Sequence, residues 1–185
     1  MKSKLFFVLF IIFSLFIQAQ TTSNFRILLH STKSIDDNFG ITGWVVAPNI
    51  TNNPQKWLGV AGIRYTTENF WIEFMGGAIN EKSNLTGLLD ARQSFTKLSP
   101  ITFWANEEWI FGKAFYFFIQ ADHWVSNILA IGIETENSVF KSEGTDDISY
   151  GPHLIVPMNK MTLVGVYQFH SGSNDQFWMR LVIDL

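Results

Sequence analysis

The sequence contains no cysteine, and this excludes several classes of protein at once. Without thiols there is no disulfide scaffold, no thiolate zinc site, no cysteine nucleophile and no N-terminal lipoprotein anchor. Charge is also scarce, because Asp, Glu, Lys and Arg make up 16% of the 185 residues, whereas soluble domains average about 25%. After the first 20 residues no apolar run reaches the roughly 18 residues of a transmembrane helix, so no such helix is predicted.

The first residues have the composition of an export signal. Lys2 and Lys4 precede an apolar run over residues 5–17, which is followed by Gln18-Ala19-Gln20. A basic start, a short apolar core and a small residue at its end predict a signal peptide over residues 1–19. The pattern resembles signal peptides of Bacteroidota, which often end in Ala-Gln.

The net charge of the chain without this signal peptide is −5. Removal of Lys2 and Lys4 reduces Lys plus Arg from 13 to 11, against 16 Asp plus Glu. We therefore expect no nucleic-acid partner.

The rest of the chain alternates between apolar and polar residues with a period of two. In the C-terminal segment every second residue from Phe177 to Leu185 is apolar, and the residues between them include Arg180 and Asp184. This period is typical of β-strands, whose successive side chains point to opposite faces. It marks ten candidate strands, separated by turn-like clusters, over residues 41–48, 57–66, 69–79, 85–95, 101–111, 113–123, 127–137, 147–157, 163–170 and 177–185. Merging neighbours would give eight.

The composition of the two strand faces favours a barrel in lipid over a soluble barrel or sandwich. One face carries bulky Phe, Leu, Ile and Met, whereas the other mixes small residues, aromatics and isolated charges, as a narrow packed lumen would. Aromatic residues also gather near strand ends, as expected of interfacial girdles, at Trp57, Trp71, Trp109, Phe111 and Trp124. We predict an all-β, antiparallel, up-and-down transmembrane β-barrel of about ten strands over residues 41–185. Single-chain bacterial barrels have an even strand number.

Residues 20–40 are left over, and we assign them to an N-terminal periplasmic segment. The stretch around Phe25 could instead form a strand, a strap or a plug.

The last strand carries a resemblance to a known class. Its apolar alternation continues to the final residue, which resembles the C-terminal recognition signal of outer-membrane barrels, although Leu185 stands where an aromatic residue is usual. The chain thus resembles small bacterial outer-membrane β-barrel proteins in architecture, with no family-specific motif. This resemblance implies a place in the outer membrane, contact with its lipid and an opportunity to contact other envelope proteins.

Charged residues fall on the faces that we expect to point inward. We predict that they form a network of charges in the lumen, made by Arg64, Glu73, Asp90, Arg92, Asp122, Glu134, Arg180 and Asp184. Opposite charges in a low-dielectric interior pair with each other, and a paired network needs no further role. A barrel of eight to ten strands has little more width than its own side chains fill. An ion or solute pathway is the alternative interpretation.

Histidines offer a second, weaker signal. His153 and His170 lie on neighbouring candidate strands and could share a polar site, but no histidine spacing matches a metal motif. We expect no metal and no cofactor.

The segment after His170 faintly resembles the His-x-Ser-Asn motif of outer-membrane lipid A deacylases, which use a Ser-His-Glu triad. Here the second residue after the histidine is Gly172, which has no nucleophile, so a polar hairpin loop explains the segment without catalysis.

Together these patterns predict a non-enzymatic integral outer-membrane β-barrel with a packed polar lumen. Its role would be structural, or that of an accessory subunit in an envelope assembly, with loops 49–56 and 139–146 most available to partners. Two alternatives remain open. One is a soluble exported β-barrel that binds an apolar ligand, and the other is a lipid A-modifying hydrolase centred on His170.

Overall fold

The computed structural model describes residues 22–81, 84–98, 100–140 and 148–185. These residues form eleven strands: β1 (Thr22–Ser34), β2 (Phe39–Ala47), β3 (Trp57–Thr66), β4 (Phe70–Glu81), β5 (Asn84–Leu98), β6 (Ile101–Ile110), β7 (Ala114–Ser126), β8 (Leu129–Phe140), β9 (Ser149–Met158), β10 (Met161–His170) and β11 (Gln176–Asp184). None of the described residues belongs to a helix that could cross a membrane.

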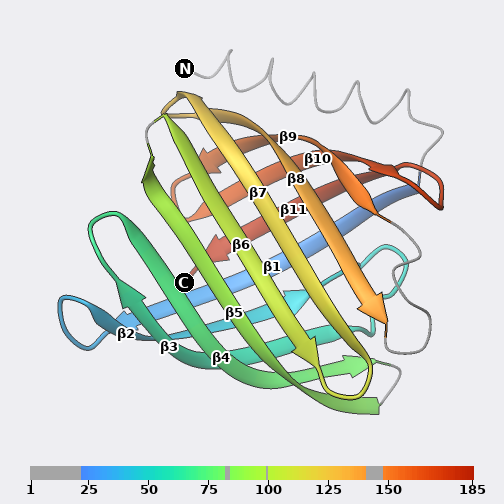
Figure 1. Cartoon of the computed structure of the whole chain (residues 1–185), viewed down its shortest axis with the longest axis horizontal. Coiled ribbons are helices and arrows are strands. Elements are labelled where there is room, and N and C mark those ends of the chain that lie inside the picture. The colour runs from blue at the N-terminus through green and yellow to red at the C-terminus, as the bar shows by residue number, and fades with distance from the viewer. Residues whose placement is uncertain (1–21, 82–83, 99, 141–147) are drawn as a thin grey trace.

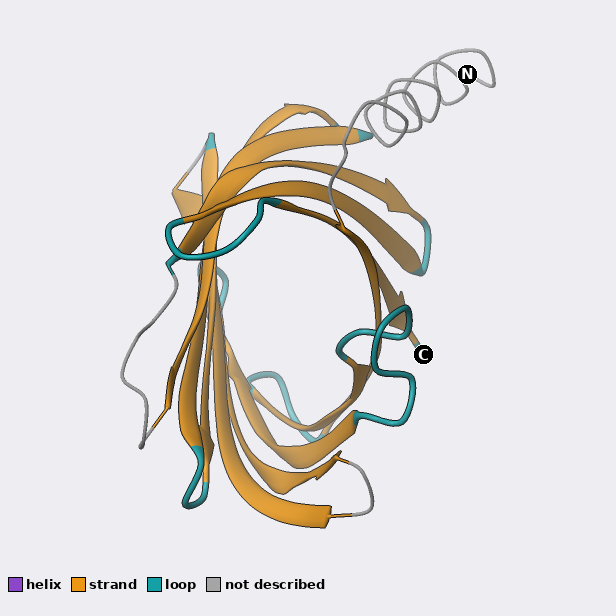
Figure 2. Cartoon of the chain, turned by 90° about the vertical axis from the view of Figure 1, so that its right-hand side faces the viewer, coloured by secondary structure: helices purple, strands orange, loops and turns teal. Residues whose placement is uncertain are grey.

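The strands form one closed barrel (Figure 1). Each strand pairs antiparallel with its neighbours in the chain, as expected of an up-and-down barrel. The barrel closes where β1 pairs parallel with β11, in a register that runs from Thr22 opposite Gln176 to His30 opposite Asp184. Figure 2 looks into the resulting ring of strands.

This architecture confirms the predicted all-β, up-and-down barrel fold, with a correction at its beginning. The ten predicted strands correspond to β2–β11, and the eleventh is β1, inside the stretch assigned to a periplasmic segment. Residues 22–34 are thus part of the barrel wall, and the expected even number of strands is wrong. The cause is visible in the residues, because Phe25, Ile27 and Leu29 alternate with Asn24 and Arg26 as in the other strands. The predicted signal peptide, 1–19, lies outside the described residues.

The two ends of the barrel differ in the length of their connections. At the end that carries the C-terminus, which we call the turn end, strands are joined by short turns such as 67–69, 127–128 and 159–160. In the turn between β1 and β2, the backbone N–H groups of Asn38 and Phe39 donate to Asp36 and hold the pKa of its carboxyl below its usual value. At the opposite end, the loop end, β2 and β3 are joined by residues 48–56. Membrane barrels have short periplasmic turns and longer outer loops.

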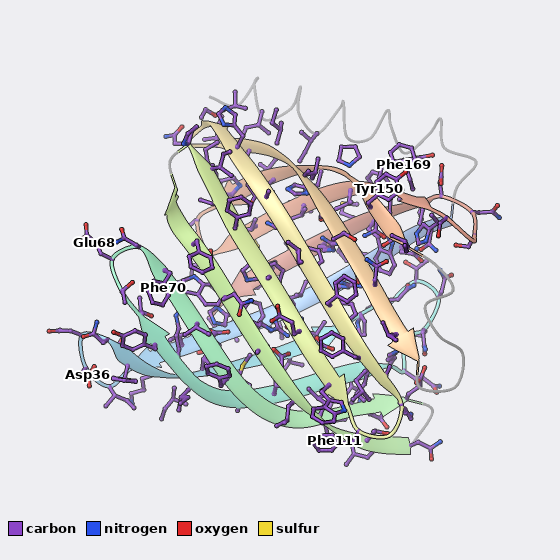
Figure 3. The ribbon with its side chains drawn as sticks, viewed as in Figure 1. Asp36, Glu68, Phe70, Phe111, Tyr150 and Phe169 are labelled. Carbon is purple, nitrogen blue, oxygen red and sulfur yellow. The ribbon has the colours of Figure 1, made fainter. Side chains whose placement is uncertain are left out.

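The outer face of the barrel is apolar and the inner face is largely polar. Glu73 and Phe74 are neighbours in β4, yet Glu73 is 0% exposed and Phe74 is 55% exposed. On the outside, Tyr150 and Phe169 face each other across β9 and β10 with ring centroids 5.8 Å apart (Figure 3). A soluble barrel that binds an apolar ligand needs the reverse arrangement, so this alternative is disfavoured. The observed arrangement is that of a membrane barrel.

Four of the five aromatic residues expected at the rims are exposed there: Trp57, Trp109, Phe111 and Trp124. Trp71 differs, because its parity in β4 matches that of Glu73 and its ring stacks on the guanidinium of Arg64 at 4.3 Å. It therefore belongs to the inner face, where it supports a charged residue instead of marking a membrane interface.

Candidate functional site: the lumen

The polar side chains of the lumen gather in two groups. The Glu134 cluster comprises Glu134, Glu136, Arg26, Arg180, His153, Asp122 and Gln168, which come from β1 and β7–β11. The Glu73 cluster comprises Glu73, Thr42, Trp44, Arg64 and His30, which come from β1–β4. Both are positioned by the period of two in the strands, which turns every second residue inward.

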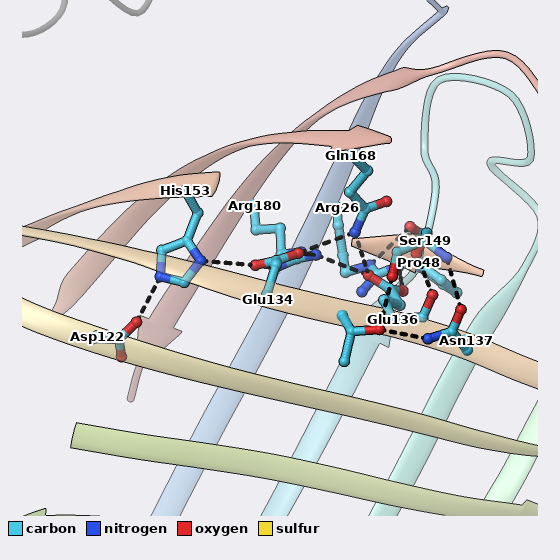
Figure 4. A network of polar contacts seen from close by, with 11 residues as sticks. Arg26, Pro48, Asp122, Glu134, Glu136, Asn137, Ser149, His153, Gln168 and Arg180 are labelled. Carbon is cyan, nitrogen blue, oxygen red and sulfur yellow. Dashed lines mark hydrogen bonds and ion pairs between the residues drawn. The ribbon is translucent and has the colours of Figure 1, made fainter. Parts of the chain in front are cut away.

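Two arginines neutralise the paired carboxylates of the Glu134 cluster. Glu134 and Glu136 are two residues apart on β8 and so share the inner face. Arg180 of β11 donates from Nη1 to Glu134 Oε2 at 2.7 Å and from Nη2 to Glu136 Oε2 at 2.8 Å. Arg26 of the adjacent β1 pairs with Glu136, and Gln168 Nε2 donates to Glu134 Oε1 at 3.0 Å (Figure 4). Each carboxylate thus has at least two donors.

His153 extends this cluster toward the turn end. Its Nε2 lies 2.6 Å from Asp122 Oδ1, and its Nδ1 lies 3.4 Å from Glu134 Oε2 (Figure 4). The buried ring comes from β9 and lies beside Gly132, the cross-strand partner of His153 on β8. A Cβ at Gly132 would collide with the imidazole, so this glycine makes the space for the ring. Both ring nitrogens therefore face a carboxylate.

Glu73 is satisfied in a different way, mainly by neutral donors. Thr42 Oγ1 donates to its Oε1 at 2.7 Å and Trp44 Nε1 donates to its Oε2 at 2.8 Å. Arg64 Nη1 is 3.3 Å away, and His30 Nε2 is 3.4 Å away. The His30 ring also stacks on Trp44, with centroids 4.1 Å apart.

Arg92 lies between the two groups, near the middle of the lumen. It donates to Asp90 in a bidentate pair, at 3.0 and 2.8 Å, and its guanidinium lies 4.3 Å from the ring of Trp44. Arg92 Nη1, Asn106 Oδ1 and Arg180 Nε are buried atoms with no hydrogen-bond partner among the described residues. All three residues line a cavity of about 40 Å³. Such a cavity suits one or a few bound water molecules.

The lumen is wide at the loop end and narrow in the middle. A cavity of about 350 Å³, which we call the vestibule, is lined by residues that include Pro48 and Asn49 of the loop after β2. The two cavities are adjacent, because both are lined by Arg26, Val46, Glu108 and Tyr116. At the smaller cavity Arg92 and Arg180 extend into the lumen and meet their carboxylates.

Most of the predicted lumen charges do lie together inside the barrel. Arg64 pairs with Glu73, Arg92 with Asp90, Arg180 with Glu134, and Asp122 with His153. Asp184 differs, because it lies at the turn end with 58% of its side chain exposed and contacts His30 at 2.8 Å.

The structure does not bring His153 and His170 to one position. His153 pairs with Val166 on β10, whereas His170 pairs with Ser149, a separation of four residues or about 13 Å along the strand. In the loop after His170, Ser171 Oγ accepts a hydrogen bond from the N–H of Ile148 at 2.9 Å. Within the described ranges no group of three or more His, Asp or Glu side chains is arranged to hold a metal ion.

Sequence reasoning missed Arg26, His30 and Glu136 as members of the network. The signal for Glu136 was present, since it shares the face of Glu134 at a spacing of two. Arg26 and His30 were missed because they lie on β1, which was not assigned as a strand.

The fold and the lumen define a closed β-barrel with an apolar outside and a charged interior. The solved structure described as "KdgM porin in complex with disordered oligogalacturonate" is similar to this chain, with a TM-score of 0.54 and 16% sequence identity. The similarity covers 79% of this chain and 83% of the porin chain. At this identity the likeness concerns the fold alone. No family model and no curated protein matches the chain.

Proposed function

We propose that this chain is a non-enzymatic integral barrel of a Gram-negative outer membrane whose lumen is closed by its own polar side chains. In this proposal it is a structural or accessory subunit of an envelope assembly and not an open diffusion pore. The observation that carries the proposal is that Arg92 and Arg180 and their carboxylates occupy the lumen beyond the vestibule, around a cavity of only about 40 Å³.

The narrow part of the lumen is held closed by interactions that are costly to break. A cavity of this volume holds a few waters, and no sugar or amino acid fits. To widen it, Arg180 would have to leave Glu134 and Glu136, which would separate its buried guanidinium from both carboxylates. Separation of a buried ion pair costs several kcal/mol, on the order of 3–5. Spontaneous opening would therefore be rare.

The charges of the lumen do not favour transport of an acidic polymer such as the oligogalacturonate named for the similar porin. Four arginines face the lumen, and each has a carboxylate within ion-pair distance: Arg26, Arg64, Arg92 and Arg180. The lumen carboxylates are more numerous: Glu73, Asp90, Glu108, Asp122, Glu134 and Glu136. A polyanion would thus meet an excess of like charge.

Export and an outer-membrane location are part of the same proposal. The apolar outer face, the exposed aromatic residues at the rims and the contrast between short turns and longer loops support insertion in a bilayer. The predicted signal peptide supports export. Lipid is then the first partner of the outer face, and the loop after β2 is available to other envelope proteins.

Two measurements test the proposal in turn. Envelope fractionation followed by a gel with and without boiling should show release only by detergent and a shift in mobility on heating. Release without detergent, with no shift, would contradict the membrane location.

In planar bilayers the purified barrel should give no stable conductance. The comparison variant is Glu134→Ser/Arg180→Ser, which removes a buried ion pair from the lumen without leaving a lone charge and should conduct ions. Steady conductance by the unmodified chain would contradict the closed lumen.

A further inference from the structure

The vestibule has two walls of different chemical character. A closed lumen would not need this difference. One wall is aliphatic and consists of Val46, Leu58, Ile79 and Ile110, which come from β2, β3, β4 and β6. The opposite wall is polar and aromatic and consists of Arg26, Tyr116, Glu136, Ser138 and Trp178. Small-molecule sites in the mouths of barrels have this character, with volumes of about 300–1,000 Å³ and a few polar groups on a largely apolar lining.

The charged side chains of the vestibule are already compensated. Arg26 pairs with Glu136, and Lys56 lies 3.7 Å from Glu81. Glu108 lies 3.8 Å from Arg92 and accepts a hydrogen bond from Asn106 Nδ2 at 2.9 Å. A charged ligand would lose its hydration without gaining an unpaired counter-charge. The vestibule is thus suited to an uncharged molecule.

One side chain of the polar wall carries a donor without a protein partner in the described part of the chain. Trp178 Nε1 is buried and has no hydrogen-bond partner among the described residues. One face of its ring is covered by the guanidinium of Arg26, 4.8 Å from the ring centroid, which fixes the orientation of the indole. A buried N–H without an acceptor is costly, and a ligand that carries a hydroxyl or carbonyl oxygen would supply the acceptor.

Amide hydrogen bonds fix the mouth of the vestibule. Asn49 Nδ2 and Asn52 Nδ2 both donate to Asn24 Oδ1, at 2.9 and 2.6 Å, and Asn24 Nδ2 donates to Gln176 Oε1 at 2.8 Å. These bonds tie the loop after β2 to β1 and β11. Because the loop is held in place before any ligand arrives, binding would cost little ordering entropy.

We propose that the vestibule is a binding site for a small uncharged amphiphile, a molecule with one apolar face and an edge that accepts hydrogen bonds. The apolar face would lie on Val46, Leu58 and Ile79, and the accepting edge would meet Trp178. The site opens at the loop end and ends at the narrow part of the lumen. The ligand would be held at the mouth of the barrel, whether or not the lumen conducts.

The test uses the full chain in lipid nanodiscs with three water-soluble probes that share a nitrophenyl group. The probes are p-nitrophenyl β-glucoside, which is uncharged, p-nitrobenzoate, an anion, and p-nitrobenzylamine, a cation. Binding is measured by calorimetry, and the site is located by methyl NMR shifts of Val46, Leu58 and Ile110. We expect saturable binding of the glucoside that shifts these methyl groups, and binding of the two charged probes that is at least tenfold weaker.

Two variants and one control separate the vestibule from other surfaces. Trp178→Phe keeps the ring and removes the N–H, and it should weaken glucoside binding roughly 5- to 10-fold. Ile79→Trp fills the aliphatic side and should abolish binding. Ile63→Trp, a matched change on the outer face of β3, should leave binding unchanged. The heat shift on gels confirms that each variant folds.

Several outcomes would overturn the proposal. These are no saturable binding of the glucoside, equal binding of a charged probe, or glucoside binding that Trp178→Phe leaves unaltered in a folded barrel. All of these outcomes are measured by binding. They are therefore independent of the conductance measurement that tests the closed lumen.

Discussion

The Glu73 and Glu134 clusters solve the same problem, a buried carboxylate inside a barrel, by different means. Glu73 accepts from Thr42 and Trp44 at 2.7 and 2.8 Å, and its arginine is more distant at 3.3 Å. Glu134 and Glu136 instead depend on Arg26 and Arg180. The first cluster is built mainly from neutral hydrogen bonds and the second mainly from charge pairs.

This difference predicts how each cluster responds to the loss of one side chain. A carboxylate held by several neutral donors keeps most of its stabilisation when one donor is lost. Two carboxylates of like charge, two residues apart on one strand, repel each other unless cations stand between them. The Glu134 cluster should therefore fail when a single arginine is removed, whereas the Glu73 cluster should weaken by degrees.

The largest expected effect is that of Arg180→Ala. The change leaves Glu134 with His153 and Gln168, and Glu136 with Arg26 as its one remaining arginine. We expect the free energy of unfolding to fall by about 3–5 kcal/mol, measured by urea titration of the folded barrel in lipid vesicles. The double variant Arg180→Met/Glu134→Leu removes both charges and should recover most of that loss. A single variant as stable as the exposed outer-face control Ile63→Ala would show that Arg180 is not needed to compensate the carboxylates.

A smaller loss is expected for Trp44→Phe in the other cluster. Phenylalanine keeps an aromatic ring against His30 and Arg92 but removes the N–H that donates to Glu73. A hydrogen bond to a charged group contributes about 1.5–3 kcal/mol, and the same titration should show a loss in this range. Trp109→Phe on the outer face is the matched control and should change stability by less than about 0.5 kcal/mol. Equal effects of the two changes would argue against the role assigned to the Trp44 N–H.

The smallest effect is expected for Arg64→Met. The side chain lies at the turn end, is 17% exposed, and is one of four groups around Glu73. Its removal should cost about 1 kcal/mol, near the range of exposed ion pairs. A loss as large as that of Arg180→Ala would mean that Glu73 also depends on a cation, and the contrast between the clusters would disappear.

Local periodicity was enough to predict most of this fold. The alternation from residue 41 onward located ten of the eleven strands and placed residues such as Glu73, Arg92 and Arg180 on the inner face. This works because the face of a strand residue is a local property, set by parity. The same rule explains why Arg26 was missed, since it applies only after a segment has been recognised as a strand.

Pairing inside the lumen could not be predicted in the same way. Arg180 meets Glu134 across 46 positions of sequence, and Trp44 meets Glu73 across 29. Which residues meet depends on strand tilt, register and the point of closure, and these are set by the whole barrel. The proposed site in the vestibule was likewise invisible, because its walls come from strands that are distant in the chain.

The parallel seam between β1 and β11 places the start of β1 and the end of β11 at opposite ends of the barrel. Thr22 pairs with Gln176 near the loop end, and Asp184 pairs with His30 near the turn end. The first and last strands of the barrel therefore run in the same direction. The start of β1 lies at the loop end, and the end of β11 lies at the turn end. If the turn end faces the periplasm, Thr22 at the start of β1 lies at the cell exterior and Asp184 at the end of β11 lies on the periplasmic side. Labels attached at Thr22 and at Asp184 would therefore lie on opposite sides of the membrane.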